Sequence, residues 1–253
     1  KPWQLSIPTI HIDSTPNTDQ IYTAELEIVG SIGAILHAVA GSYKSQPKWS
    51  EKQVAQHRKR LTSHYYAGRV KGKLNPTDVV DVVRQAVPRN TVVSCDVGSH
   101  KLLIGQGWTT YQPRGVMMTN GLSAMGYSLP AAIVASMMSP KTPPVCFIGD
   151  GGFAMVQGEL RLAASLRLGL TVVVLCDNSL NRIEIKQIVK KYPSCGTRID
   201  PTDCAALAQS MGCDGYQVST AKQLEQVLSQ SKPKNKPVVI GVTIDPAQYK
   251  AQF

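Results

Sequence analysis

Two carboxylates follow two short apolar runs of the sequence, an arrangement that could hold a metal ion. Asp150 comes shortly after the run 144–148, and Asp177 comes directly after the run 170–176. Both runs are short, β-branched and free of polar alternation, which is typical of buried parallel strands. Because open α/β sheets bind ligands at the carboxyl ends of their strands, we expect both carboxylates at that edge. Two hard oxygen ligands at one edge suit Mg²⁺.

Glycines surround the first of these carboxylates. Gly149, Gly151 and Gly152 allow the backbone to come close to a phosphate group at the start of a helix. The segment 158–168 has helical spacing with its apolar residues on one face, so it predicts the helix that joins the two strands. The sequence therefore predicts one βαβ unit with a phosphate cradle beside a metal site.

The spacing of this unit resembles the signature of the thiamine diphosphate enzymes. The sequence Gly-Asp-Gly at 149–151 is followed, after the 25 residues 152–176, by Asp-Asn-Ser at 177–179. This is similar to the family's Gly-Asp-Gly…Asn-Asn pattern. A lone Gly-Asp-Gly is a common turn, whereas the pair at this spacing, with matching strands, is specific. Asp177 departs from the usual asparagine, but it supplies the same kind of oxygen with more charge.

The resemblance implies that the site binds thiamine diphosphate and Mg²⁺. Asp150, Asp177 and the backbone carbonyl of Ser179 would hold Mg²⁺ between the two phosphates of the cofactor. The glycines at 149, 151 and 152 would lie against the diphosphate. In such enzymes the cofactor supplies the carbon chemistry, and the protein binds and orients it.

Residues 120–132 form a second informative stretch, Asn-Gly-Leu-Ser-Ala-Met-Gly-Tyr-Ser-Leu-Pro-Ala-Ala. Its small residues indicate that the backbone can come close to a neighbouring group. A tightly packed helix is expected to follow, to about residue 136. The stretch resembles the family's Gly-Leu-Gly-x-Met-Gly-x-x-Leu-Pro-Ala-Ala segment. By that resemblance, Met125 lies beneath the bent cofactor, and its amide and the carbonyl of Ser123 hold the aminopyrimidine ring. Without the resemblance, a methionine at this spacing is more often part of a core.

Residues 91–95 predict another strand, and the following loop contains Gly98, Ser99 and His100. In the family resembled, the loop after this strand contacts the diphosphate, which implies that role for these three residues. Taken alone, His100 could also be a surface imidazole with satisfied hydrogen bonds. Further along, the polar and basic segment 181–196 resembles the loop and short helix that cover the family's active site. The dipeptide at 200–201, Asp-Pro, is expected to cap the next helix.

The predicted elements indicate an α/β protein with a doubly wound, mostly parallel sheet and helices on both faces. Residues 74–253 predict this domain, which by the resemblance is the pyrophosphate-binding domain. Residues 1–45 predict two strands and a helix and resemble the end of the central domain of acetolactate-synthase-like enzymes, so we expect a partial α/β domain there. Residues 46–73 predict a basic linker that is partly helical near 51–65.

Composition narrows the class of protein. The 253 residues carry 27 basic and 17 acidic side chains, a net charge of +10, with eight basic residues against one acidic residue in 46–73. We interpret that segment as a solvated face, because no arginine-rich helix, zinc spacing or RNA-binding motif accompanies it, and we expect no nucleic-acid partner. No apolar run could span a membrane. The six cysteines form no Cys-x-x-Cys pair, which favours a soluble cytoplasmic protein.

The resemblance implies an acetolactate synthase-like transferase or lyase that decarboxylates a 2-oxo acid and joins the product to an acceptor. In this family the glutamate that activates the aminopyrimidine ring lies in an amino-terminal pyrimidine-binding domain, usually from a partner subunit. We therefore expect no catalytic residue in this chain, no turnover by the isolated chain, and a homodimer or tetramer. The alternatives are another thiamine diphosphate-dependent 2-oxo-acid decarboxylase or lyase, and a non-catalytic cofactor-binding or subunit-interaction module.

Overall fold

The structure is a computed structural model that describes residues 3, 6–19, 21–44 and 48–252. The chain divides into two compact units, Lys1–Gln56 and His57–Phe253. The change from the first segment to the basic linker, predicted at residue 46, lies outside the described residues.

The first unit contains two strands and a helix, as the sequence predicted. Strands β1 (Ile10–Asp13) and β2 (Leu26–Val29) pair in parallel. Helix α1 (Ile32–Ser42) begins after Ser31, whose side chain accepts a hydrogen bond from the backbone N–H of Ala34. The connection between the strands is tied to β1 by a 2.7 Å hydrogen bond between His11 Nδ1 and the hydroxyl of Tyr22.

Helix α2 (Glu51–Tyr65) confirms the helix expected near 51–65. Apart from Tyr65, its side chains are exposed, including the basic ones. His57 contacts Arg60 at 2.9 Å, one turn further along the same helix. These observations agree with the interpretation of this basic segment as a solvated face.

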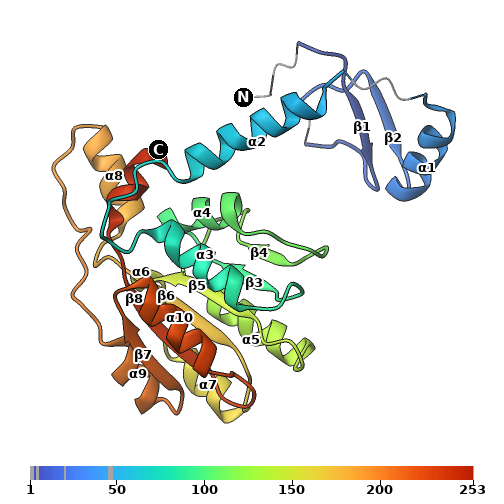
Figure 1. Cartoon of the computed structure of the whole chain (residues 1–253). Coiled ribbons are helices and arrows are strands. Elements are labelled where there is room, and N and C mark those ends of the chain that lie inside the picture. The colour runs from blue at the N-terminus through green and yellow to red at the C-terminus, as the bar shows by residue number, and fades with distance from the viewer. Residues whose placement is uncertain (1–2, 4–5, 20, 45–47, 253) are drawn as a thin grey trace. The chain divides into compact units, whose positions relative to one another are not determined.

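The second unit is built on a six-stranded sheet in which every strand pair is parallel (Figure 1). The order across the sheet is β4-β3-β5-β6-β8-β7. The strands are β3 (Val93–Cys95), β4 (Val116–Met118), β5 (Val145–Gly149), β6 (Thr171–Cys176), β7 (Asp214–Val218) and β8 (Val238–Thr243). The prediction of a doubly wound α/β fold is confirmed.

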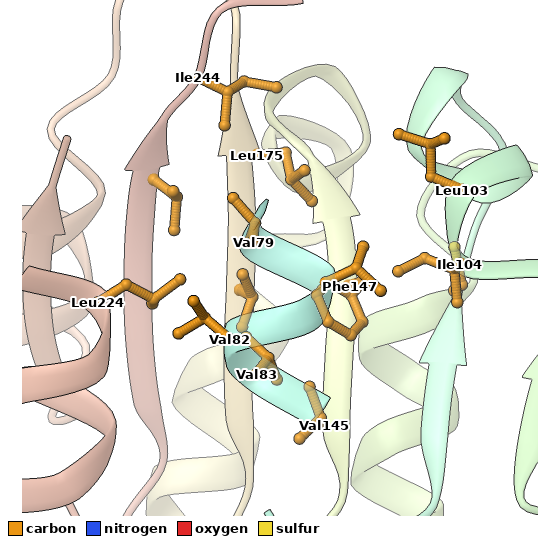
Figure 2. Close-up of a cluster of buried hydrophobic side chains, with 14 of the residues drawn as sticks. Val79, Val82, Val83, Leu103, Ile104, Val145, Phe147, Leu175, Leu224 and Ile244 are labelled. Carbon is orange, nitrogen blue, oxygen red and sulfur yellow. The ribbon is translucent and has the colours of Figure 1, made fainter. Parts of the chain in front are cut away.

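Helices cover both faces of this sheet because its strands are apolar on both sides. In β5, Val145 and Phe147 pack into one buried cluster, whereas Cys146 and Ile148 pack into the other. Figure 2 shows the first cluster, in which Phe147 packs with Val79 and Ile104 from two helices. Helices α3 (Pro76–Ala86), α4 (Ser99–Gly107) and α10 (Ala221–Gln230) contribute to the first cluster. Helices α5 (Ser128–Met138), α6 (Asp150–Val156), α7 (Glu159–Ser165) and α9 (Cys204–Ser210) contribute to the second.

The strand order creates a switch point between β3 and β5. The chain runs from β3 outward to β4 at one edge, and then returns to β5 on the other side of β3. Connections that leave neighbouring strands in opposite directions open a crevice at their carboxyl ends, and ligands of doubly wound sheets bind there. None of the helices in the described part of the chain is long and apolar enough to cross a membrane.

Two further elements complete the carboxyl edge of the sheet. Helix α8 (Asn181–Val189) follows β6, and the 3₁₀ helix η1 (Pro246–Gln252) follows β8. The η1 segment is held by the fully buried Gln248, whose Oε1 accepts hydrogen bonds from the backbone N–H and the hydroxyl of Thr77 in α3. The first turn of α3 is therefore hydrogen-bonded to a residue that lies 171 positions further along the chain.

One helix start was predicted wrongly. The N-cap of α9 is Asp203, not Asp200, and its side chain accepts a 2.9 Å hydrogen bond from the N–H of Ala206. Both aspartates are acceptable cap residues, so the choice depends on where the chain reaches the sheet. Cys204 is fully buried against the sheet, which sets the first turn of the helix at that residue.

The central strand β5 gives the first testable prediction. Phe147 is fully buried and lies edge-to-face with Trp108 at a centroid distance of 5.7 Å. We expect Phe147→Ala to lower the free energy of unfolding by about 3–5 kcal/mol, because it leaves a cavity between sheet and helices. Urea unfolding would measure this, with Met138→Ala as a control at a side chain that is 80% exposed. Equal effects of the two substitutions would contradict this description of the core.

Candidate cofactor-binding site

A cavity of about 340 Å³ lies at the carboxyl edge of the sheet. It is lined by the loops after β3, β5 and β6, together with α8, η1 and residues Ser123 and Met125. The structure brings all the predicted site residues together around this one cavity. They are Gly98, Ser99, His100, Ser123, Met125, Gly149, Asp150, Gly151, Gly152, Asp177 and Ser179.

The two predicted metal ligands come from adjacent strands. Strands β5 and β6 pair in parallel, and Asp150 and Asp177 directly follow their last residues. Asp150 Oδ2 accepts hydrogen bonds from the backbone N–H groups of Asp177, at 3.1 Å, and Asn178, at 2.7 Å. The carboxylate of one strand end therefore binds the backbone of the other.

Burial and mutual repulsion disfavour the charged forms of these carboxylates. Burial raises the pKa of Asp150 above its ordinary value, although three backbone N–H groups oppose that shift. Burial, followed by the negative charge of Asp150, raises the pKa of Asp177 to about 7. Two crowded acidic groups of this kind are a pair that a divalent cation would stabilise, because it would compensate both charges.

The turn after β6 is fixed by hydrogen bonds on both sides. The N–H of Ser179 donates to Asp177 Oδ1 at 3.1 Å, and its hydroxyl donates to Glu184 in α8 at 2.7 Å. Glu184 also forms a 2.9 Å ion pair with Arg198. Between the two turn residues, Asn178 has a left-handed backbone with φ of 56°. This turn is therefore held by Glu184, near the start of the segment 181–196 that the resemblance implied would cover the site.

The loop after β3 presents the predicted diphosphate contacts. The Ser99 hydroxyl donates a 2.7 Å hydrogen bond to Asn181 Oδ1 at the start of α8. His100 is only 5% exposed, and its Nε2 lies 3.0 Å from the fully buried carboxylate of Asp96. The alternative that His100 is a surface imidazole is therefore wrong. The imidazole of His100 does form a hydrogen bond, but its partner is Asp96 in the interior of the protein.

Residues Thr119–Gly126, here called the wedge segment, carry Ser123 and Met125 to the cavity. Ser123 has a left-handed backbone with φ of 55°, and its hydroxyl donates to the carbonyl oxygen of Thr119 at 3.3 Å. Gly126 also has a positive φ of 80°. Met125 is partly buried and lines the cavity, in contrast to a core side chain such as the fully buried Leu129.

Several cavity residues were not predicted. Arg182, Ile183 and Lys186 of α8 line the cavity, and so does Tyr249 of η1, whose side chain is buried. The basic character of 181–196 was a usable signal for the α8 residues. Tyr249 had none, because it reaches the site only through the docking of the carboxyl terminus. Asp96, which directly follows the predicted strand 91–95, was not among the predicted site residues, and nothing in the sequence indicated that it would be buried.

The donor set fits Mg²⁺ and a diphosphate. Asp150 and Asp177 offer hard carboxylate oxygens, and each carboxylate can accept more hydrogen bonds or metal contacts than it makes here. Among the described residues, no cluster of three His, Cys, Asp or Glu side chains could hold a metal ion by itself. A cation at this pair would therefore draw its other ligands from backbone, water or a bound phosphate, as Mg²⁺ commonly does.

Comparison with known proteins identifies relatives of this chain. Residues 96–242 match the family described as "Thiamine pyrophosphate enzyme, C-terminal TPP binding domain". The chain is 29% identical over 241 residues to acetolactate synthase of Bacillus subtilis, covering 93% of this chain and 42% of that protein. It is 28% identical over 255 residues to the acetolactate synthase isozyme 3 large subunit of Escherichia coli, covering 95% and 44%.

A third relative has a less specific name. The putative thiamine pyrophosphate-containing protein YdaP of Bacillus subtilis is 33% identical over 171 residues, covering 68% of this chain and 30% of that protein. The chain therefore spans less than half the length of each of these relatives.

The raised pKa of Asp177 gives a prediction for the metal-free protein. Between about pH 4 and pH 7 the folded protein holds a proton on Asp177 that the unfolded chain has lost, so its contribution to stability decreases as pH rises through that window. Asp177→Asn should remove this decrease, making the variant more stable than the parent at pH 7.5 by about 1–4 kcal/mol.

Urea unfolding with a chelator present, at several pH values from 4.5 to 8, would measure this difference. Asp214→Asn is the control, because that carboxylate is half-exposed and pairs with Lys236 instead. Parallel stability curves for the parent and Asp177→Asn would show that the pKa of Asp177 is not raised in the folded protein.

Proposed function

The chain belongs to the thiamine pyrophosphate enzymes and contains their carboxyl-terminal cofactor-binding domain, and we propose that it forms the thiamine diphosphate- and Mg²⁺-binding part of an acetolactate synthase-like enzyme. The observation that carries this proposal is the pair of crowded carboxylates, Asp150 and Asp177, at adjacent strand ends of a cavity at the switch point. Because the chain spans less than half of its relatives, the activity of the whole protein is part of the proposal.

In this proposal, Mg²⁺ is bound by the carboxylates of Asp150 and Asp177 and by the backbone carbonyl of Ser179. The cation would offset the negative charge of the two carboxylates and would supply a binding partner for the diphosphate. Gly98, Ser99 and His100 contact the diphosphate from the other side of the cavity. The glycines at 149, 151 and 152 keep the loop after β5 free of side chains, so that phosphate oxygens can approach the backbone.

The wedge segment supports the other end of the cofactor. Met125 offers a flexible apolar side chain beneath the cofactor, while the backbone of Ser123 and Met125 holds the aminopyrimidine ring. When bound, thiamine diphosphate supplies the nucleophilic carbon and the electron sink for decarboxylation of a 2-oxo acid and transfer of the remaining fragment. Arg182 and Lys186 add positive charge to the same cavity, which suits an anionic substrate or the diphosphate.

The cavity supports the expectation that the activating glutamate belongs to another domain or subunit. Of the acidic residues in the described part of the chain, those that line the cavity are Asp150 and Asp177, both assigned to the metal. One relative is named a large subunit, which is consistent with an assembly of several subunits. We propose that a pyrimidine-binding domain or subunit closes the cavity in a homodimer or tetramer, and that the substrate is a 2-oxo acid.

The metal assignment predicts that cofactor binding needs both the cation and Asp150. In the complete enzyme, we expect calorimetry to detect thiamine diphosphate binding only when Mg²⁺ is present. Asp150→Ala should weaken the affinity for thiamine diphosphate by at least about 10-fold, because the negative charge of the phosphates is then compensated less. Asp214→Ala, at a half-exposed carboxylate outside the cavity, should bind like the parent. Undiminished affinity in Asp150→Ala would refute the assignment, and absence of binding in the parent would refute the proposed function.

The position of Met125 predicts a loss of turnover that exceeds the loss of stability. Met125→Ala should misplace the reactive carbon relative to the amino group of the cofactor, whereas a core methionine would cost about 2–5 kcal/mol of stability. Turnover per folded enzyme and melting temperature should be measured together in the complete enzyme. Leu129→Ala is the matched control, since Leu129 is fully buried in the neighbouring core. A collapse in melting temperature with normal turnover per folded Met125→Ala enzyme would assign Met125 to the core instead.

A further inference from the structure

A fully buried carboxylate, Asp96, lies behind the cavity. It follows β3, and both of its oxygens accept hydrogen bonds within the protein. Asp96 Oδ1 lies 3.0 Å from His100 Nε2, and Asp96 Oδ2 accepts the backbone N–H of Gly126 at 2.7 Å. Among the described residues, no lysine or arginine forms an ion pair with it. A buried carboxylate is costly unless each oxygen is paired, so its presence requires both partners to stay in place.

These two partners belong to the two parts of the proposed cofactor site. His100 stands in the first turn of α4 and is one of the residues proposed to contact the diphosphate, whereas Gly126 ends the wedge segment, directly after Met125. The other end of the wedge segment is held from the same helix, because the ammonium group of Lys101 donates to the carbonyl oxygen of Thr119. The chain from the end of β3 to the start of α4 therefore holds the wedge segment at both of its ends, through Asp96 at Gly126 and through Lys101 at Thr119.

The surrounding backbone leaves room for the carboxylate and the imidazole. A Cβ atom added to Gly152 would lie 2.4 Å from Asp96 Oδ2, and one added to Gly98 would lie 2.4 Å from His100 Cε1. The positive φ of Gly126, which side-chain-bearing residues rarely adopt, turns its N–H toward Asp96. Gly152 of the predicted phosphate cradle and Gly98 of the loop after β3 therefore have a second reason to be glycine, which is contact with this pair and not with a ligand.

Asp96 also determines how the imidazole of His100 can act. An ionised carboxylate only accepts hydrogen bonds, so the Nε2 atom of His100 must carry the hydrogen in this contact. The remaining nitrogen, Nδ1, lies toward Gly98 and Gly149, both of which line the cavity. A carboxylate behind an imidazole fixes its orientation and tautomer and stabilises a positive charge on the ring. With its hydrogen on Nε2, the neutral ring can only accept a hydrogen bond at Nδ1, whereas the positively charged ring that Asp96 stabilises carries a second hydrogen on Nδ1 and can donate it to an anionic group.

We propose that Asp96 is a positioning residue. It joins the loop after β3 to the wedge segment, and it orients His100 toward the diphosphate. This inference rests on the proposed function, because the ligand it positions is thiamine diphosphate. Asp96 itself lies outside the set of residues that line the cavity. Its effect on binding is therefore exerted through His100 and through the backbone at Gly126.

The test is calorimetry of thiamine diphosphate with Mg²⁺, using the full-length protein that contains this chain. Asp96→Asn keeps the size of the side chain but cannot accept both hydrogen bonds and presents an N–H group to one partner. We expect it to raise the Kd by about 10–100-fold, the usual effect of changing a residue that orients a ligand-binding side chain. The melting temperature should be recorded without cofactor for every variant.

Ser136→Ala is the matched control. Ser136 is also buried, and its hydroxyl donates a 3.0 Å hydrogen bond to the carbonyl oxygen of Gly169, but it does not line the cavity. This substitution should lower the melting temperature and leave the Kd unchanged. If Asp96→Asn also lowers only the melting temperature, its role is structural and the proposal is overturned. If the parent protein binds no thiamine diphosphate, the proposed function fails instead.

If Asp96→Asn does not fold, a measurement on the parent protein tests the proposed role of Asp96 instead. Nitrogen NMR of the histidine rings, with His100 assigned by loss of its signal in His100→Gln, should find hydrogen on Nε2 in the cofactor-free protein. Addition of thiamine diphosphate and Mg²⁺ should then shift the Nδ1 resonance while Nε2 keeps its hydrogen. An Nε2 atom without hydrogen, or an Nδ1 resonance that cofactor does not move, would overturn the proposal.

Discussion

The pairing of β5 with β6 imposes the constraint on which the site depends. Because the two strands are parallel and adjacent, the residues that follow them, Asp150 and Asp177, emerge at the same edge of the sheet. Neither carboxylate can move away without disturbing that edge, and their negative charges repel each other in a partly buried space. The sheet therefore holds two carboxyl groups that resist carrying two negative charges together, and a bound cation would stabilise both charged forms, which is the physical basis for the proposed Mg²⁺ site.

The remainder of the carboxyl edge is held together by hydrogen bonds between segments that are distant in sequence. Ser99 binds Asn181, Asp150 binds the backbone at 177–178, and Glu184 binds Ser179. The bonds of Ser99 and Asp150 join loops that leave different strands, and the bond of Glu184 ties α8 to the turn that precedes it. As a result, the loops that would contact the cofactor and the helix α8 that lines the cavity form one connected network. Such cross-linked loops can keep a binding geometry that isolated loops would not maintain.

The predictable part of this protein is the part encoded in short stretches of sequence. The apolar runs at 144–148 and 170–176 became β5 and β6 because each strand is buried on both faces, which demands a continuous apolar run. The spacing of the two strands also predicted that Asp150 and Asp177 would meet. The motif residues at 98–100 and 123–125 were recognisable because each motif lies within a few neighbouring positions.

Other features were decided only by the tertiary structure. The pairing of Asp96 with Gly126, the arrival of Tyr249 at the cavity and the choice of Asp203 as a cap all depend on where distant segments pack. Such contacts leave no period or spacing in the sequence, because each is a single hydrogen bond or packing contact across many residues. The sequence alone determined which local elements form and which motifs they carry. Folding decided which side chains those elements bring face to face, because only the assembled sheet brings its carboxyl ends together.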